Sequence, residues 1–270
     1  MRILILFIVT CSLSFAQENK VAKKVVALSP ATVELLFTLG AGDRIVATVE
    51  YADYPEQAKK IPRIGNYLGI QIEKLVELYP DLVVVWQTGN KASDLKKIES
   101  LGFDVLYLNP ANIGDIAQDL IKLGDKLGLQ EKANNVAQSL LNKYQAIKAV
   151  YKNKRSISVF YQLWHQPLRS VGPKSWVGSL LNDCNAANIF STASDYPLVS
   201  KEDVIVKNPE VIIVAGHGKV ESTQLWEKWP ELQAVAKKQI YQVEGDTLHR
   251  FSTRALDGLE KLCQLIDQAR

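Results

Sequence analysis

Two glutamates lie at equivalent places in two copies of one sequence pattern. The interval from Glu73 to Glu202 equals the interval from Pro80 to Pro209, and both prolines precede matching apolar runs. Taken alone, each glutamate is explained as a helix-start carboxylate stabilised by the helix dipole. As a pair, they predict docking on a partner with two equivalent subunits, through arginines that bind carboxylates in a bidentate manner.

Aromatic side chains recur where predicted strands end and in the loops that follow. The set is Tyr51, Tyr54, Tyr67 and Trp86 in the first half, and Trp164 and Tyr196 in the second. Ordinary packing accounts for any one of them. Because ligand sites of α/β proteins lie at strand ends, the set together predicts a cleft with flat apolar walls. Such walls suit a large, flat, partly apolar ligand better than a phosphate or a sugar-sized anion.

The sequence contains none of the familiar catalytic motifs. It has no Gly-x-Ser-x-Gly elbow, no phosphate loop and no His-Glu-x-x-His pair. His165, His217 and His249 are far apart in sequence, and their meeting at a zinc ion is the alternative that stays open. We expect no catalytic residue, no metal site and no enzymatic activity.

Strands and helices alternate along the first half. Predicted strands are 24–28, 44–48, 81–86 and 105–108, and predicted helices are 30–39, 71–78, 92–101 and 113–127. Ser29 as N-cap, Pro30 in the first turn and Gly40 after the end mark the first helix clearly. This order predicts a parallel sheet covered by helices.

The plan then repeats after one long helix, predicted over 131–151. Later strands are expected at 157–161, 211–215 and 240–243, with helices at 176–181 and 254–268. Val26 matches Ile157, and Val105 matches Ile240, at nearly the interval that separates the two prolines. Three matches in order predict an α/β fold of two Rossmann-like lobes. The lobes, 17–128 and 154–270, are joined by a single α-helical segment, 129–153, with a ligand cleft between them.

Composition narrows the class of protein. Of 270 residues, 47% are hydrophobic and 23% charged, which excludes a disordered chain. The balance of 32 basic against 29 acidic residues argues against a nucleic-acid partner.

Residues 1–16 read as a secretion signal. Arg2 precedes an apolar run, and Ser14 and Ala16 form a small-x-small cleavage signal, best cut after Ala16. The alternative of a membrane anchor needs about 20 apolar residues and finds only about 14. A lipoprotein at Cys11 is disfavoured because Thr10 fits a lipobox poorly.

Cleavage would leave Cys184 and Cys263. In an oxidising compartment, two cysteines are most simply a disulfide, and two separate buried thiols are the alternative.

Several segments carry a family resemblance. They are 28–34 (LSPATVE), 51–55 (YADYP), 80–86 (PDLVVVW) with Gly89-Asn90, 184–190 (CNAANIF), 200–202 (SKE) and the late Cys263. Together they resemble the periplasmic substrate-binding proteins of ABC importers, in the class with a rigid helix between two lobes. Among these proteins, the chain is most similar to the cobalamin (vitamin B12) binders.

The resemblance implies roles for particular residues. Corrin contacts are implied for Tyr51, Tyr67, Trp86, Trp164, Tyr196, Asp246, Thr247, Leu248, His249 and Arg250. Glu73 and Glu202 would dock on arginines of the two permease subunits, and Cys184 and Cys263 would match the family's disulfide. The sequence departs from the family at Tyr67 and Tyr196, where tryptophan is commoner, and at Thr247 and His249, which replace bulkier or acidic residues. No cofactor is implied, because cobalt arrives already ligated; His249 is the residue that could still contact it.

We therefore expect a monomeric periplasmic receptor that captures cobalamin and delivers it to an inner-membrane ABC transporter. The same fold carrying haem or a ferric siderophore is one alternative. A periplasmic enzyme on a two-lobed α/β scaffold is the other.

Overall fold

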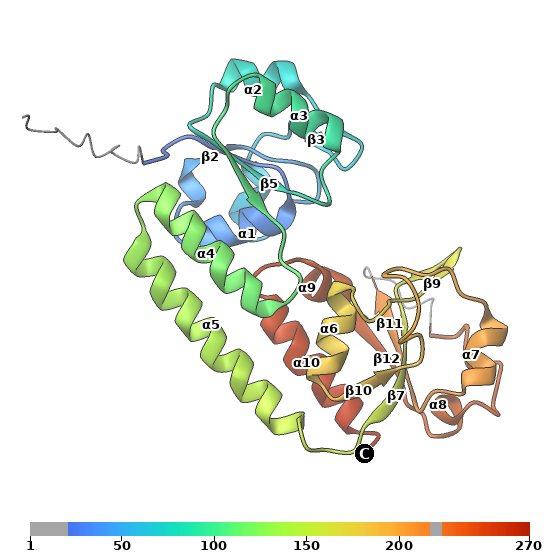
Figure 1. The fold of residues 1–270 in the computed structure, drawn as a ribbon. Coiled ribbons are helices and arrows are strands. Elements are labelled where there is room, and N and C mark those ends of the chain that lie inside the picture. The colour runs from blue at the N-terminus through green and yellow to red at the C-terminus, as the bar shows by residue number, and fades with distance from the viewer. Residues whose placement is uncertain (1–20, 217–222) are drawn as a thin grey trace, which may run out of the picture.

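The computed structural model describes residues 21–216 and 223–270, which form two α/β lobes connected along one side by helices (Figure 1). The predicted signal segment 1–16 and His217 lie outside these residues. The predicted fold class is confirmed: each lobe is built on a four-stranded parallel sheet with flanking helices.

The first lobe contains a sheet in the order β2-β1-β5-β6. Its strands are β1 (Val25–Ala27), β2 (Ile45–Ala47), β5 (Leu82–Trp86) and β6 (Val105–Leu108). Its helices are α1 (Pro30–Thr38), α2 (Ile72–Leu78), α3 (Ala92–Ser100) and α4 (Ile113–Leu127), with short 3-10 turns η1 (Gly42–Arg44) and η2 (Glu56–Lys60). A small hairpin of β3 (Gly65–Asn66) and β4 (Gly69–Ile70), which the sequence analysis did not predict, precedes α2.

The second lobe contains a sheet in the order β10-β7-β11-β12. Its strands are β7 (Ile157–Gln162), β10 (Ala186–Asn188), β11 (Val211–Gly216) and β12 (Ile240–Glu244), with a hairpin of β8 (Trp164–His165) and β9 (Leu168–Arg169). Its helices are α6 (Trp176–Asp183), α7 (Lys201–Lys207), α8 (Gln233–Ala236), α9 (Gly245–His249) and α10 (Ala255–Asp267). The edge strand β10, the hairpin and the short helices α8 and α9 were not among the predicted elements, whereas α7 begins where Glu202 was expected to start a helix.

Helix α5 (Gln130–Tyr151) confirms the long connecting helix, one residue longer at its start than predicted. It packs along α4 of the first lobe and α10 of the second, so it runs beside both lobes (Figure 1). The exact lobe boundaries, 17–128 and 154–270, remain predictions.

The two sheets repeat one plan, with a small shift in register. Val25 lies opposite Leu82 in the first lobe, and Val159 lies opposite Val211 in the second. Val26 is therefore the structural equivalent of Phe160, and the sequence match of Val26 with Ile157 is out of register. The match by sequence was out of register because both strands are short and largely apolar, so that several alignments along them look similar.

A carboxylate holds the start of the first strand in both lobes. Asp81 accepts hydrogen bonds from the main-chain N–H groups of Lys23 and Lys24, at 3.0 and 2.9 Å. Glu210, its counterpart after the second proline, accepts one from the N–H of Ser158 at 3.0 Å. The repeat thus extends from strand order to individual polar contacts.

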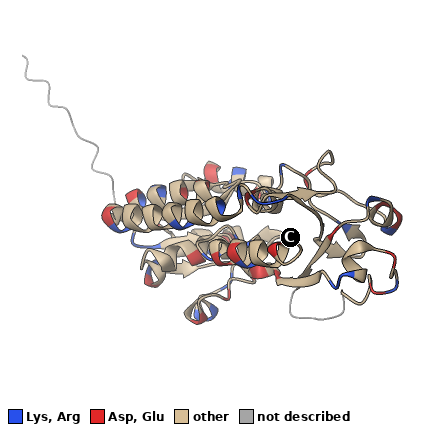
Figure 2. Ribbon diagram, turned by 90° about the horizontal axis from the view of Figure 1, so that it is seen from below, with Lys and Arg blue, Asp and Glu red and all other residues tan. Residues whose placement is uncertain are grey.

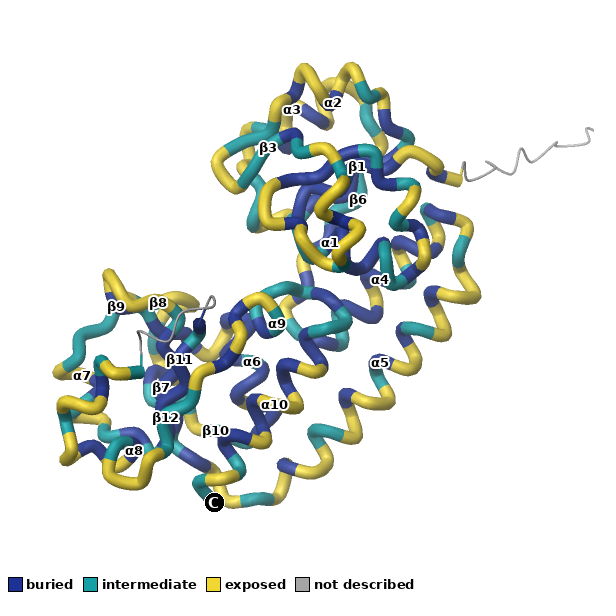
Figure 3. Tube along the Cα trace, turned by 180° about the vertical axis from the view of Figure 1, so that it is seen from behind, coloured by how far each residue is buried: buried dark blue, intermediate teal, exposed yellow. Residues whose placement is uncertain are grey.

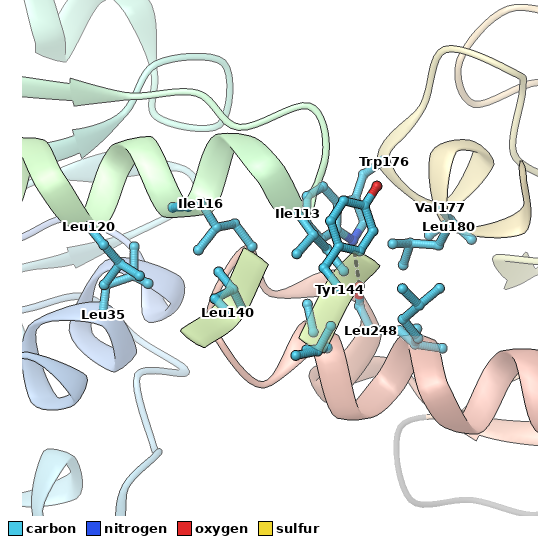
Figure 4. Close-up of a cluster of buried hydrophobic side chains, with 14 of the residues drawn as sticks. Leu35, Ile113, Ile116, Leu120, Leu140, Tyr144, Trp176, Val177, Leu180 and Leu248 are labelled. Carbon is cyan, nitrogen blue, oxygen red and sulfur yellow. Dashed lines mark hydrogen bonds between the residues drawn. The ribbon is translucent and has the colours of Figure 1, made fainter. Parts of the chain in front are cut away.

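The largest hydrophobic core belongs to both lobes at once. It joins residues of α1 and α4 in the first lobe to residues of α6, α9 and α10 in the second, with α5 between them. Figure 4 shows this continuity from Leu35 and Leu120 through Leu140 and Tyr144 to Leu180. In Figure 3 the turns of α5 alternate between buried and exposed along the side that connects the two lobes. The far face of each sheet has a separate, smaller core.

The predicted disulfide is confirmed. Cys184, at the end of α6, is bonded to Cys263 in α10, and both residues are fully buried. Acidic and basic residues are interspersed over the ribbon in Figure 2, in keeping with the small net charge. Within 21–216 and 223–270, no helix is both long and apolar enough to cross a membrane.

Candidate functional site

The carboxyl ends of the two sheets face each other. Trp86 is the last residue of β5, and Phe251 follows α9, which itself follows the end of β12. The two rings meet edge to face, 4.9 Å apart, across the lobe junction. Since ligand sites of parallel sheets lie beyond the carboxyl ends of the strands, this junction is the floor of the candidate cleft.

Trp86 is held from several sides. The Asn90 side chain accepts a hydrogen bond from the N–H of Trp86 and donates one to the carbonyl of Leu28, both at 2.7 Å. Gly89 is required here, because a Cβ at this position would overlap the Trp86 ring. Phe251 in turn packs on Trp176, with ring centroids 4.7 Å apart. The floor is therefore a row of three interlocked aromatic rings, and Phe251 was not among the predicted site residues.

Two predicted tyrosines of the first lobe lie on exposed loops. Tyr51 has a left-handed backbone conformation with φ of 65° and a largely exposed side chain. The Arg63 guanidinium fixes this loop by donating to the carbonyl of Ala52 at 2.7 Å. Tyr67 lies at the tip of the β3–β4 hairpin and is 72% exposed. Both rings are presented to solvent.

The second lobe presents two further predicted aromatic residues. Trp164 in β8 and Tyr196 in a loop are each nearly half exposed. The indole N–H of Trp164 donates to the carbonyl of Gln166 at 3.1 Å, and Arg169 donates to the carbonyl of Tyr196 at 2.9 Å. Burial raises the pKa of the Tyr196 hydroxyl, with a smaller effect in the same direction from Asp195.

The predicted stretch 246–250 forms α9 and its C-cap, and its residues have different surroundings. Asp246 pairs with Arg250 at 3.2 Å, and the Thr247 hydroxyl donates to Glu244 at 3.0 Å. Leu248 is 1% exposed and lies in the shared core, where its carbonyl accepts a hydrogen bond from the Trp176 indole at 2.6 Å (Figure 4). Its side chain positions the helix and offers no surface to a ligand in this conformation.

The two described histidines, His165 and His249, have different neighbours. His249 Nε2 is 2.8 Å from the hydroxyl of the buried Tyr161, whose pKa is raised by burial. His165 packs against Trp164 on the hairpin, 5.6 Å between centroids. In the described part of the chain, no three His, Cys, Asp or Glu side chains come close enough to hold a metal ion.

The glutamates of the repeat occupy matching positions on matching helices. Glu73 is the second residue of α2, and Glu202 is the second residue of α7. Both helices end in a left-handed residue, Tyr79 or Asn208, with φ of 43° and ψ of 64° in each case. Both carboxylates are exposed, and Lys97 approaches Glu73 only to 4.0 Å.

A cavity of about 700 Å³ opens beside the β8–β9 hairpin of the second lobe. Its lining includes Trp164 and His165 of the hairpin and Lys201 and Glu202 of α7. The structure therefore brings a predicted ligand residue, Trp164, and a predicted docking residue, Glu202, to one hollow.

Comparisons with known proteins agree with this architecture. Residues 25–247 match the model of a family described as periplasmic binding protein. The vitamin B12-binding protein of Vibrio campbellii is 32% identical over 259 residues, covering 95% of this chain and 93% of the relative. That of Vibrio cholerae is 31% identical over 274 residues and covers 99% of both chains.

Solved structures of known proteins also superimpose on this chain. The periplasmic vitamin B12-binding protein BtuF of Vibrio cholerae superimposes with a TM-score of 0.86 at 32% identity, covering 92% of this chain and 98% of that one. The haem-binding protein RhuT from Roseiflexus sp. RS-1 has a TM-score of 0.82 at 20% identity, covering 92% of this chain and 99% of that one, which shows the shared fold alone. This chain belongs to the periplasmic binding protein family.

Proposed function

We propose that this protein captures cobalamin between its two lobes and delivers it to an inner-membrane ABC transporter, without carrying out a chemical step. The observation that carries the proposal is the set of aromatic side chains at the facing ends of the two sheets. Exposed rings are contributed by Tyr51 and Tyr67 from one lobe and by Trp164 and Tyr196 from the other. The relatives named vitamin B12-binding proteins support the choice of ligand.

The physical basis of affinity would be apolar contact with the corrin. Large exposed aromatic residues leave apolar surface in water, and covering it with a flat ligand is favourable by about 25 cal/mol per Å². Aspartates at the junction would orient the ligand, since Asp53 and Asp246 are each about half exposed and carboxylates accept hydrogen bonds from amide groups. His249 is engaged by Tyr161, which favours a binding mode in which the protein leaves cobalt unligated.

Calorimetric titration with cyanocobalamin tests the ligand. We expect binding at micromolar or lower concentration, weakened about tenfold in Tyr67→Ala if the lost contact is worth about 1.4 kcal/mol. Tyr79→Ala is the control, because Tyr79 is at least as exposed as Tyr67 but lies before β5, at the amino end of the sheet. Absence of heat with cyanocobalamin would refute the proposal. A Soret band in the purified protein would instead favour haem.

We further propose that Glu73 and Glu202 dock on arginines of the two transporter subunits, with one monomer of this protein on each permease dimer. Their matching helix positions and exposure support this role. Charge reversal at both positions should abolish cobalamin uptake in whole cells and leave affinity intact. Glu77→Lys, an exposed glutamate of the same α2 helix, is the control. If Glu202→Lys alone lowers affinity, the cavity shared with Trp164 is part of the ligand site.

Cleavage after Ala16 and release into the periplasm complete the proposal. The family of periplasmic binding proteins supports this location. Mass spectrometry of the periplasmic fraction should find a chain that begins at Gln17.

A further inference from the structure

Glu34 is a charged residue buried between the lobes. It lies in the middle of α1, and its side chain is only 2% exposed. A buried carboxylate is unfavourable unless it is paired and hydrogen-bonded. The identity of its partners therefore indicates what the residue does.

The Glu34 carboxylate accepts hydrogen bonds from three side chains, and all three belong to the second lobe. Arg250 and Arg254 each donate through Nη1 to Oε1 at 3.0 Å, and the hydroxyl of Ser252 donates to Oε2. These donors all lie in the turn 250–254, between α9 and α10. One carboxylate of the first lobe thus binds a whole turn of the second.

The same turn contacts the first lobe at further points. Arg250 Nη1 also donates to Asp53 at 2.7 Å. The Arg254 guanidinium stacks on the ring of Tyr54, 3.8 Å from its centroid. The hydroxyls of Thr38 and Thr253 are 3.3 Å apart. All of these contacts join segments from opposite ends of the chain, which meet only when the lobes come together.

The guanidinium of Arg250 is largely occupied by protein groups. Its side chain is 10% exposed, and it is paired with Glu34 and Asp53 across the junction and with Asp246 in its own lobe. Phe251, the next residue, carries the ring that packs on Trp86. The position of the aromatic floor therefore depends on how residues 250–254 are held.

We propose that Glu34 is a positioning residue that clamps the 250–254 turn onto the first lobe, and so sets the lobe separation and the placement of Phe251 against Trp86 at the cleft floor. Arg250 then affects ligand binding by holding the aromatic rings of the cleft floor in place, rather than by donating a hydrogen bond to the ligand. This inference deepens the proposed function, but the clamp itself exists without ligand.

Hydrogen–deuterium exchange of the ligand-free protein tests the clamp directly. In Glu34→Ala, we expect the amides of residues 250–256 to exchange at least tenfold faster, while the central amides of β5 and β11 keep their protection. Glu34→Gln keeps the shape and one acceptor oxygen, so its effect should be smaller. Glu131→Gln, an exposed carboxylate at the start of α5, is the matched control and should change nothing. If Glu34→Ala fails to fold, Ser252→Ala removes one donor of the same clamp with a minimal change in volume.

Stopped-flow tryptophan fluorescence with cyanocobalamin provides the functional measurement. In Glu34→Ala, which releases the clamp, the dissociation rate of cyanocobalamin should rise at least fivefold, and its association rate should change less than twofold. A fivefold effect is within the usual range of coupling between two sites. Unchanged exchange at 250–256 in a folded Glu34→Ala or Ser252→Ala protein would overturn the inference. A wild-type protein that does not bind cyanocobalamin would overturn the proposed function, and the exchange experiment would still decide the clamp.

Discussion

The packing of Phe251 between two tryptophans makes Phe251→Ala a sharp test of how the lobes are joined. Its ring is 4.9 Å from Trp86 in the first lobe and 4.7 Å from Trp176 in the second, edge to face in both cases. Aromatic pairs of this geometry contribute about 0.5–1.5 kcal/mol each beyond the area they bury. The apolar area of a partly buried phenylalanine adds about 1–2 kcal/mol. We therefore expect the free energy of unfolding to fall by about 2–5 kcal/mol.

Urea unfolding followed by far-UV circular dichroism measures this loss. A double-mutant cycle with Trp86→Leu isolates the contact across the junction, and its coupling energy should be about 0.5–1.5 kcal/mol. The unfolding transition should stay single in the wild type, because one core serves both lobes. A loss below about 1 kcal/mol, or strictly additive effects of the two substitutions, would refute the reasoning that these rings couple the lobes.

Three further outcomes follow from single features. Replacing Cys184 and Cys263 by alanine should lower the free energy of unfolding by about 4–5 kcal/mol, because the disulfide closes a loop with a sequence separation of 79. Chemical denaturation measures this loss. A decrease in the free energy of unfolding of under about 1 kcal/mol would contradict the prediction. Burial tends to raise the pKa of Asp53, but the hydrogen bond and charge of Arg250 outweigh it and hold that pKa below the usual 3.8. Asp53 therefore stabilises the fold above about pH 4 and loses this contribution as the pH falls further, so Asp53→Asn should flatten the acid limb of a melting-temperature profile. Trp176→Phe removes the indole N–H that donates to the buried main-chain carbonyl of Leu248 in α9, and it should lower the free energy of unfolding by about 1–3 kcal/mol. Thermal unfolding measures this loss, and Trp164→Phe, which changes a tryptophan that is nearly half exposed, is the control.

Much of the fold could be predicted because its signals are local. Ser29 caps α1 by accepting a hydrogen bond from the N–H of Thr32 at 3.1 Å, as its position before Pro30 indicated. Ser200 and Asp203 form a capping box at the start of α7, a pattern that is visible in the sequence. The buried strands β5 and β11 are continuous apolar runs, which no exposed segment would tolerate.

Other elements carry no such signal. The edge strand β10 reads Ala186-Ala187-Asn188, residues of low strand propensity, and it is a strand only because β7 supplies its hydrogen-bond partners. The small hairpins are too short for a visible alternation of apolar and polar residues.

The sequence and its family resemblance pointed to the aromatic residues at strand ends and to Asp246 and Arg250, but not to Phe251 or to the buried Glu34. Rings at strand ends are recognisable because such large residues are rarely left exposed without a reason. Glu34, by contrast, is the only charged residue of the largely apolar helix α1, and the sequence around it does not identify its partners. Ser252 and Arg254 read as a helix start. Their meeting depends on the relative placement of two lobes, and no local pattern encodes a contact between residues at opposite ends of a chain.

The shared core bears on how this protein could be divided or recombined. A fragment that ends after α4 would leave the inward faces of α1 and α4 without the α5 and α6 side chains that cover them. Such a fragment would expose a broad apolar surface and aggregate, although its sheet is complete. Chimeras that exchange one lobe with a relative would succeed only if the helices at the junction travel with it. The sequence pattern is therefore repeated in each half of the chain, but neither half is expected to fold without the other.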